Sequence, residues 1–244
     1  MIDPRLVQVQ QACPAWFSIE RVAGDELLGV ARPLGTCWTE SGVPLRMTAS
    51  FRVTVGETRP GAVFPARCPE RHIQANQTFC LGLAPVQPSA PETAEQFWEQ
   101  LRQYMVCQHV AELTGIWPPA HALSHGDAGV PHERALAIAA ELGLSDEYDR
   151  ARLDEPSWIT DKSLRIVSPS GTLLNGRAAC PRGCRHDRRP HRPILRRDCK
   201  RRDLVAELVL RERDRRRELA RYWEAAIADG ERCCGRMQSC GLPL

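Results

Sequence analysis

Hydrophobic and polar residues alternate with a period of two in three runs within residues 16–55. The runs cover residues 16–22, 26–31 and 44–55. The alternation is imperfect in the first run and regular in the third. Turn-forming residues separate the runs at Gly24-Asp25 and at Glu40-Ser41-Gly42. Because connections this short cannot hold a parallel crossover, the pattern predicts an antiparallel β-meander.

Three later segments carry hydrophobic residues at helical spacing. These segments are residues 92–113, 131–142 and about 203–228. Ser89 and Glu92 match a capping box at the start of the first helix, with Pro91 in its first turn. Gly115 and Gly143 follow the first two helices as stop signals. The meander and the helices together predict an α+β fold in which helices pack on an antiparallel sheet.

The composition is that of an ordinary globular chain, because 43% of its 244 residues are hydrophobic and 26% are charged. Its apolar runs fall well short of the roughly 20 residues that a helix needs to cross a bilayer. The first residues lack the basic and apolar regions of a secretory signal. We therefore expect a cytoplasmic protein with no membrane contact.

The charge is divided unevenly along the chain. The whole sequence has a net charge of +3, but residues 180–221 hold 16 Lys and Arg against 7 Asp and Glu. That segment therefore carries +9 and the remainder −6, which indicates an acidic N-terminal domain and a basic appendage. The turn-forming residues 168–172 precede the change. We accordingly predict one domain over residues 1–167, with its core at about 16–144, and a basic, cysteine-rich module over 168–244.

Six of the 11 cysteines lie in the last 65 residues. They are Cys180, Cys184, Cys199, Cys233, Cys234 and Cys240. In a reducing cytosol, clustered cysteines more often bind metal or act in catalysis than form structural disulfides. Cys180 and Cys184 have close to the spacing of a zinc knuckle, and Cys199 with one residue of the last three would complete a tetrahedral Zn²⁺ site. We predict structural zinc, with unligated thiols or redox pairing as the alternative.

The basic residues of the appendage have two interpretations. An arginine-rich patch can neutralise phosphates and bind nucleic acid. It can also be the solvated face of a helix with i,i+4 ion pairs such as Glu212–Arg216. Tyr222 and Trp223 are the only aromatic residues near it, which gives little support to base stacking. We favour the solvated face.

The candidate chemistry lies in residues 67–83. A proline-rich approach leads to His72, then to a turn-forming Asn76, and then to Cys80 between Phe79 and Leu81. A free cysteine is a few per cent thiolate at neutral pH, and that form is a strong nucleophile. The plain alternative is that Cys80 is a small buried hydrophobic residue and that His72 caps a turn.

This stretch resembles the active-site region of ubiquitin-conjugating (E2-type) enzymes, and especially of bacterial E2-like proteins. The resemblance rests on His72, on Phe79-Cys80-Leu81 and on Trp117-Pro118, and it extends over about residues 16–144. It also resembles a group in which such a domain carries a cysteine-rich tail. The resemblance implies an E2 fold and a thioester on Cys80. It implies an E1-like enzyme and a ubiquitin-like modifier as partners, and a bacterial modification operon that serves antiviral defence.

The family pattern is not complete in this chain. Where eukaryotic members have Pro and then Asn after the histidine, this sequence has Ile73 and Gln74. Gln74 or Asn76 is therefore the candidate amide donor to the carbonyl oxygen that becomes negative when a lysine attacks. The departure puts transfer to lysine in doubt.

Three other functions compete with the carrier. They are a non-catalytic, zinc-stapled E2-like adaptor, a zinc-binding nucleic-acid protein, and a thiol hydrolase using Cys80 with His72 or His125. The hydrolase is the weakest, because no third orienting group is evident. We expect His121 and His125 to brace a loop. The remaining cysteines and two tryptophans are expected in the core: Cys13, Cys37, Cys68, Cys107, Trp98 and Trp117.

Overall fold

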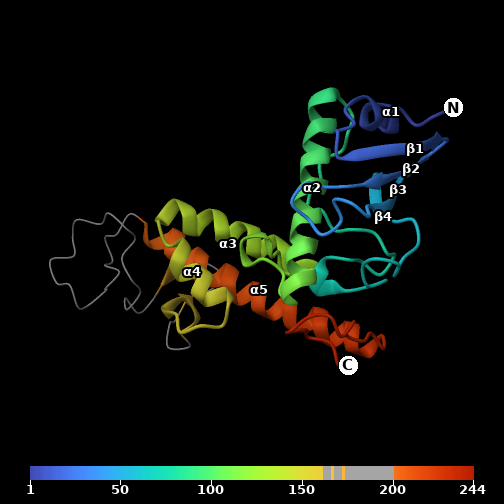
Figure 1. Cartoon of the computed structure of the whole chain (residues 1–244). Helices are drawn as coiled ribbons and strands as arrows, with labels where there is room; N and C mark the ends of the chain where they lie inside the picture. Colours follow the sequence, from blue (N-terminus) through green and yellow to red (C-terminus); the bar gives the residue numbers. More distant parts are fainter. Residues whose placement is uncertain (162–165, 168–171, 174–200) are drawn as a thin grey trace. The chain divides into compact units, whose positions relative to one another are not determined.

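The structure is a computed structural model that describes residues 1–161, 166–167, 172–173 and 201–244 (Figure 1). The chain divides into two compact units, unit 1 with Met1–Ala122 and Ile227–Leu244, and unit 2 with Leu123–Ala226. The helices are α1 (Pro4–Gln11), α2 (Pro91–Thr114), α3 (Gly129–Leu142), α4 (Ser145–Arg152) and α5 (Arg202–Ala228). The strands are β1 (Phe17–Ala23), β2 (Glu26–Ala31), β3 (Val43–Ala49), β4 (Val53–Glu57), β5 (Ile166–Val167) and β6 (Thr172–Leu173).

The predicted antiparallel meander is confirmed, with strand order β1-β2-β3-β4 in unit 1. Alternate residues of β3 are buried, namely Val43, Leu45, Met47 and Ala49. The prediction of one continuous strand over residues 44–55 is wrong. The chain turns at residues 50–52 and returns as β4, so Phe51 lies on the turn with its side chain 98% exposed.

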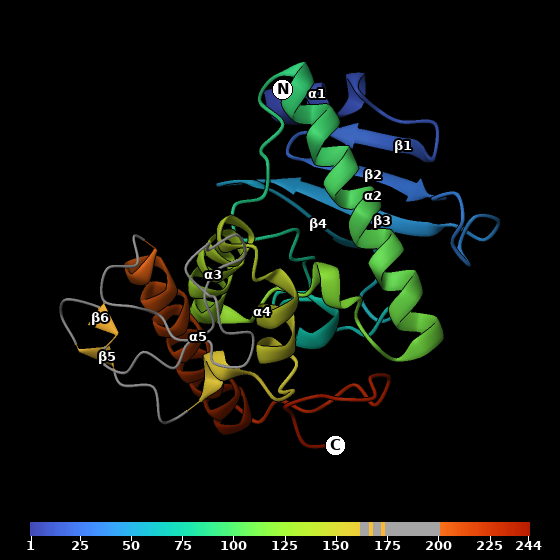
Figure 2. The same cartoon turned by 90° about the vertical axis from the view of Figure 1, so that its left-hand side faces the viewer.

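Helix α2 covers one face of this sheet (Figure 2). Its apolar stripe is buried in the core of unit 1, with Phe97 and Leu101 fully inaccessible. The helix was predicted over 92–113 and ends at Gly115, whose φ of 67° is the left-handed conformation that favours glycine. The predicted cap is wrong by one residue. Ala90 is the N-cap, and its N–H donates to the Thr93 hydroxyl at 2.9 Å.

Helix α1 was not predicted, because valine and glutamine alternate over residues 7–10 and its helical period rests on the single pair of Leu6 and Val9. Asp3 caps it by accepting a hydrogen bond from the N–H of Arg5 at 2.9 Å. Leu6 and Val9 are fully buried, and the indole N–H of Trp98 donates to the Val9 carbonyl at 3.0 Å. Packing against α2 therefore stabilises α1, which its local sequence alone does not.

Unit 2 packs α3, α4 and most of α5 around a small apolar core. The predicted helices at 131–142 and 203–228 are confirmed with slightly earlier starts. The arginine-rich part of α5 is not entirely a solvated face, which corrects the prediction. Glu212 is 1% exposed, and it pairs with Arg215 and Arg216, each at 2.7 Å. The charged pair of Glu212 and Arg215 is therefore part of the interior of this unit.

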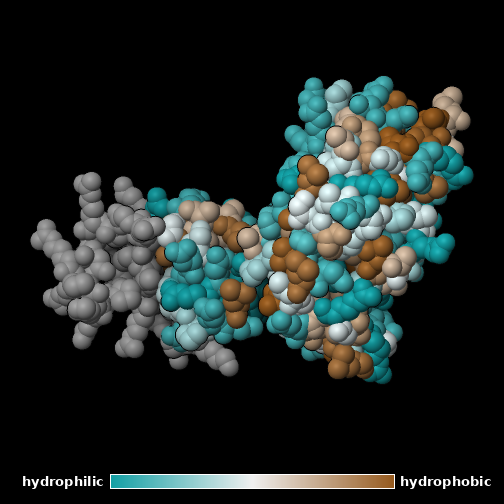
Figure 3. Space-filling model, in the orientation of Figure 1, coloured by the Kyte–Doolittle hydropathy of each residue, from teal (hydrophilic) through white to brown (hydrophobic). Residues whose placement is uncertain are grey.

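Hydrophobic and hydrophilic residues are intermixed on the face that Figure 3 presents. Among the described helices, none combines the length and the apolar character needed to cross a membrane.

Unit 2 also buries a histidine. His132 is 3% exposed, and its Nδ1 accepts a hydrogen bond from the N–H of Ser124 at 2.9 Å. Burial lowers the pKa of its imidazole from 6.5 to about 4, and the guanidiniums of Arg215 and Arg152 act in the same direction. The folded protein therefore holds His132 neutral at pH values where an unfolded histidine takes up a proton.

We predict that His132 makes unit 2 less stable as the pH falls from about 6.5 to about 4. Above pH 6.5, His132 is neutral in the folded and the unfolded chain, and the full free energy of unfolding is present. Below about pH 4 the loss of unfolding free energy is complete. It amounts to about 3 kcal/mol if each pKa unit contributes about 1.4 kcal/mol. Urea unfolding of the full chain at several pH values measures this loss. His132→Asn keeps an acceptor near Nδ1 and does not titrate, so its unfolding midpoint should fall less. Equal pH dependence of both proteins would contradict the assignment.

Candidate functional site

The segment that holds Cys80 continues the sheet beyond β4 as an irregular ribbon. Isolated β-bridges join Gly56 to Thr78 and Ile73 to Phe79, and the N–H of Phe79 donates to the Val55 carbonyl at 2.7 Å. A side chain at position 56 would lie 2.7 Å from the carbonyl oxygen of Gln77, so only glycine lets the ribbon approach β4 this closely. The ribbon therefore presents Cys80 at the end of the sheet edge.

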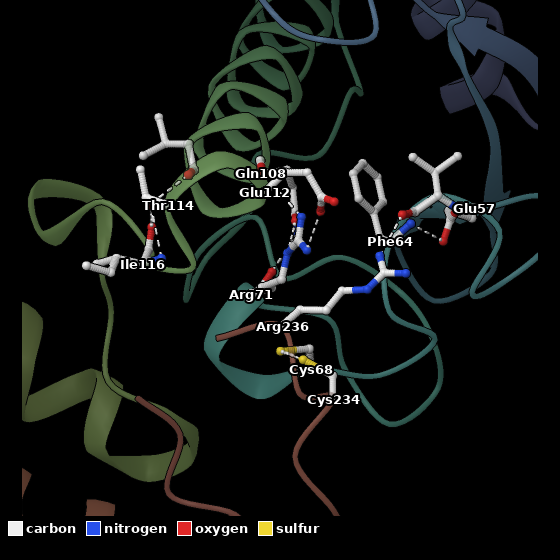
Figure 4. A network of polar contacts seen from close by, with 12 residues as sticks. Glu57, Phe64, Cys68, Arg71, Gln108, Glu112, Thr114, Ile116, Cys234 and Arg236 are labelled. Carbon is white, nitrogen blue, oxygen red and sulfur yellow. Dashed lines mark hydrogen bonds and ion pairs between the residues drawn. The ribbon is translucent and has the colours of Figure 1, made fainter. Parts of the chain in front are cut away.

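A buried arginine fixes the start of this ribbon to α2. Arg71 is 0% exposed, and its Nε donates to Oε1 of Gln108 at 2.7 Å (Figure 4). Its two Nη atoms donate to Oε2 of Glu112 at 2.8 Å and to the Gln108 carbonyl at 3.2 Å. In return, Nε2 of Gln108 donates to the Arg71 carbonyl at 2.8 Å. Acceptors on Gln108 and Glu112, on one face of α2, thus compensate the buried charge.

His72 follows in the left-handed conformation, with φ of 54° and ψ of 37°. It ends a short 3₁₀ turn (Pro69–Arg71), so the plain alternative that it caps a turn is confirmed. Its ring lies 4.8 Å from that of Trp117, and its carbonyl accepts a hydrogen bond from the N–H of Cys80 at 2.8 Å. The backbone of His72 is thus in direct contact with Cys80.

Tyr104 of α2 contacts both the 3₁₀ turn and the ribbon residue before Cys80. Its hydroxyl donates to the Arg71 carbonyl at 3.1 Å, and its ring stacks on Phe79 with centroids 4.6 Å apart. Burial raises the pKa of Tyr104, so the hydroxyl keeps the proton that it donates. Helix α2 therefore fixes both the start of the ribbon and Phe79, the residue before the candidate nucleophile.

Cys80 is half-buried, and its sulfur points toward the Gly82 carbonyl at 3.8 Å. It lines a small pocket of about 20 Å³, which is room for about one water molecule. The pocket is lined by Arg52, Val53, Thr54, Val55, Gln74, Thr78, Phe79, Cys80, Leu81, Gly82 and Pro85. An extended chain end can reach a half-buried thiol of this kind from outside.

Gln74 is brought to the same pocket, and Asn76 is not among its lining residues. Oε1 of Gln74 lies 3.2 Å from the Thr78 hydroxyl, whose single proton is shared with the closer Oδ1 of Asn76. Asn76 is exposed and holds the turn instead, because its Oδ1 accepts from the N–H and the hydroxyl of Thr78 at 3.2 and 2.7 Å. Of the two amides, Gln74 therefore has the better position for chemistry.

The predicted zinc ligands divide into two groups. Cys180, Cys184 and Cys199 lie outside the described residues, whereas Cys233, Cys234 and Cys240 are described and half-buried in unit 1. Within residues 1–161 and 201–244, no three His, Cys, Asp or Glu side chains form a group that could hold a metal ion. The described thiols by themselves therefore do not fit a zinc site.

The other cysteines and histidines were predicted to have structural roles. Cys107 is 2% exposed and Cys13 packs against the core of unit 1, but Cys37 is exposed and the prediction of a core position for it is wrong. His121 contacts Nε2 of Gln103 at 3.1 Å. His125 packs its ring against Tyr222 and Trp223 in unit 2, with centroids 5.3 and 5.1 Å apart. Trp98 and Trp117 are buried as predicted.

Sequence reasoning missed the supporting residues of the site. Gln108 falls on the apolar stripe of α2, four residues after Tyr104, and a polar residue in that position is a signal that it has a buried partner. Nothing local indicated that Arg71, 37 residues earlier, is that partner.

Two family models match this chain. One is described as a prokaryotic E2 domain and matches residues 16–119. The other is described as a cysteine-rich domain, C-terminal to the E2 domain, and matches residues 124–242. No curated protein and no solved structure matches.

We predict that Arg71→Met lowers the free energy of unfolding by about 2–4 kcal/mol, because it leaves the buried acceptors on α2 without their donor. Arg102→Met is the matched control, since Arg102 pairs with Glu99 on the exposed face of the same helix. It should change stability by less than about 0.5 kcal/mol. Urea unfolding of both variants measures the difference. Similar small losses in both would show that the Arg71 network does not hold the ribbon.

Proposed function

The chain is a prokaryotic E2 domain followed by a C-terminal cysteine-rich domain, and from this premise we propose that Cys80 carries a ubiquitin-like modifier as a thioester. The E2 domain implies a role in ubiquitin-like conjugation. The carrier function adds that this particular thiol accepts the modifier from an E1-like enzyme and passes it to a target.

The half-buried position of the Cys80 sulfur, at the end of the sheet edge, is the observation that carries this proposal. A thiol buried in the core could not meet a second protein. Cys68 and Cys107, which are 1% and 2% exposed, are excluded as carriers for that reason. Cys37 is exposed but lies outside the ribbon and its pocket.

The proposed loading step is an exchange between two thioesters. The Cys80 thiolate attacks the carbonyl carbon that joins the modifier to the E1 cysteine. The new carbon–sulfur bond forms on Cys80, the old one breaks, and the E1 cysteine leaves as thiolate. Because a thioester is made and a thioester is broken, the step needs positioning more than driving force. The hydrogen bond from the Cys80 N–H to the His72 carbonyl supplies part of that positioning.

Gln74 is the candidate hydrogen-bond donor in the discharge step, in which an amine takes the modifier from Cys80. When an amine attacks the thioester, its carbonyl oxygen gains negative charge, and a nearby donor lowers the barrier. Gln74 lines the same pocket as Cys80, and its side-chain amide can supply that donor. We assign Asn76 to the stability of the turn, since both of its interactions are with Thr78. His72 acts through its backbone as a positioning residue.

We further propose that the gene lies in a prokaryotic modification operon, beside genes for the E1-like enzyme and the modifier, and that this system serves antiviral defence. The cysteine-rich domain would hold a structural zinc ion with Cys180, Cys184 and Cys199 and one of Cys233, Cys234 and Cys240. The cysteine content of that domain and the knuckle-like spacing of its first two cysteines support the zinc proposal.

We predict that the full chain, incubated with its E1-like enzyme, modifier and ATP, gains the mass of one modifier. The adduct should disappear on treatment with a reducing thiol, because thiols cleave thioesters by exchange. Cys80→Ser should give no thiol-sensitive adduct, and any adduct that it forms should be an oxygen ester that resists the thiol. Non-reducing mass spectrometry measures both.

Cys37→Ser is the matched control, since it removes an exposed thiol of the same unit outside the ribbon. It should load like the unaltered chain. Loading that persists as a thioester in Cys80→Ser would overturn the carrier assignment. If neither protein loads with an active E1-like enzyme, the adaptor function replaces it.

For the tail, we predict about one zinc ion per chain in the purified protein, and a loss of most of it in Cys184→Ser. Metal analysis measures the content, and thermal unfolding should show a lower midpoint for the variant. Cys37→Ser, in the E2 domain, should keep its zinc. Full-length protein that carries no zinc when purified in its presence would contradict the zinc proposal.

A further inference from the structure

The last residues of the chain return to unit 1. The described segment 231–242 lies against residues 61–72, which lead into the ribbon, and against the end of α2. Arg67 forms an ion pair with Glu231, and the Arg236 guanidinium donates to the Val63 carbonyl at 3.1 Å. Residues more than 160 positions apart in sequence are therefore neighbours.

The segment is also attached to the end of α2. The N–H of Gln238 donates to the Gly115 carbonyl, and its side-chain amide donates to the Thr114 carbonyl, both at 2.8 Å. These two carbonyls belong to the helix C-terminus, where no intrahelical donor is available. Leu242 is 6% exposed, so the segment also buries apolar surface on unit 1.

Between these attachments, two thiols face each other. The Sγ atoms of Cys68 and Cys234 are 3.2 Å apart (Figure 4). Cys68 is 1% exposed and Cys234 is half-buried. A disulfide needs its sulfurs at about 2.05 Å, so the two atoms would have to move together by about 1 Å. Side-chain rotation can supply a movement of that size.

The neighbouring cysteines form a different pair. The thiol of Cys233 interacts with that of Cys240, and the N–H of Cys233 donates to the Pro243 carbonyl at 2.7 Å. Cys233 and Cys234 are adjacent in sequence and their thiols contact different cysteines, but the two pairs are neighbours, because Cys240 also raises the pKa of Cys68. Of Cys233 and Cys234, Cys234 is the one whose thiol contacts Cys68, in the chain that leads into the ribbon.

We propose that Cys68 and Cys234 are a redox pair, whose reversible disulfide ties the C-terminal segment to the chain that leads into the Cys80 ribbon. The oxidant is a small disulfide such as oxidised glutathione. The thiolate of Cys234, the more accessible of the two, first attacks this disulfide. The products are a mixed disulfide between Cys234 and half of the oxidant, and the other half as a free thiol. Cys68 then displaces the second thiol, so two cysteine thiols lose two protons and two electrons and one oxidant becomes two thiols.

The disulfide would make the position of the C-terminal segment depend on the redox state. In the reduced protein the segment is attached by hydrogen bonds and an ion pair, which can open locally. In the oxidised protein it is bonded to residue 68, four positions before His72, whose carbonyl binds the Cys80 N–H. The pair itself does not rest on the carrier function, because its oxidation requires neither modifier nor E1.

The test maps cysteines in the full chain after reduction and exposure to oxidised glutathione. After alkylation of free thiols, trypsin releases residues 68–71 and 233–236 as separate peptides. We expect them to appear joined, lighter by two hydrogen atoms than their sum, and to separate on reduction. The joined species should fall at least about tenfold in Cys234→Ser and persist in Cys233→Ser.

A second measurement does not depend on a variant of the buried Cys68. Hydrogen exchange of the amides in 231–242 should slow about tenfold on oxidation of the unaltered chain, and should not slow in Cys234→Ser. Peptide 68–71 that stays fully alkylated after oxidation would overturn the proposal. So would bound zinc that is lost when either Cys68 or Cys234 is changed to serine, because the two thiols would then be metal ligands.

Discussion

The burial of the Arg71 guanidinium is the constraint on which the rest of unit 1 depends. A charge removed from water must be paired and hydrogen-bonded, and α2 supplies the acceptors through Gln108 and Glu112. The segment around residue 71 can therefore lie in only one place against the helix. Its neighbours on both sides, Cys68 and His72, are positioned by the same requirement, and through them so are the two thiol sites of this unit.

The candidate nucleophile gains its position from this support. Tyr104 fixes the turn and Phe79, the His72 carbonyl fixes the Cys80 N–H, and the sulfur remains half-buried at the end of the sheet edge. Such a site suits acyl exchange, in which the thiol must be held and reached but need not be strongly activated. The pocket beside it is lined by Gln74 and has room for about one water molecule.

The cysteines of the cysteine-rich domain differ in their surroundings. The spacing of Cys180 and Cys184 is close to that of a zinc knuckle, whereas the thiol of Cys234 meets that of Cys68 in the E2 domain. Cys68 was predicted as core packing because its sequence neighbourhood holds no second cysteine. Its burial agrees with that prediction, but a thiol partner 166 positions away gives it a further chemistry. A local spacing rule cannot detect such a partner, because it compares only residues that are near in sequence.

The sequence by itself determined the meander, three of the helices, the family resemblance and the position of Cys80, because each depends on periodicity or on residues within a short window. It failed at α1, at the turn around Phe51 and at the cap of α2, where packing outweighs weak local preferences. Only the tertiary structure decided that Gln74 and not Asn76 shares the pocket, that Arg71 meets α2, and that Cys234 meets Cys68. These facts join residues that are distant along the chain or that differ only in side-chain direction, and the free energy that selects them arises only when the separate elements pack together.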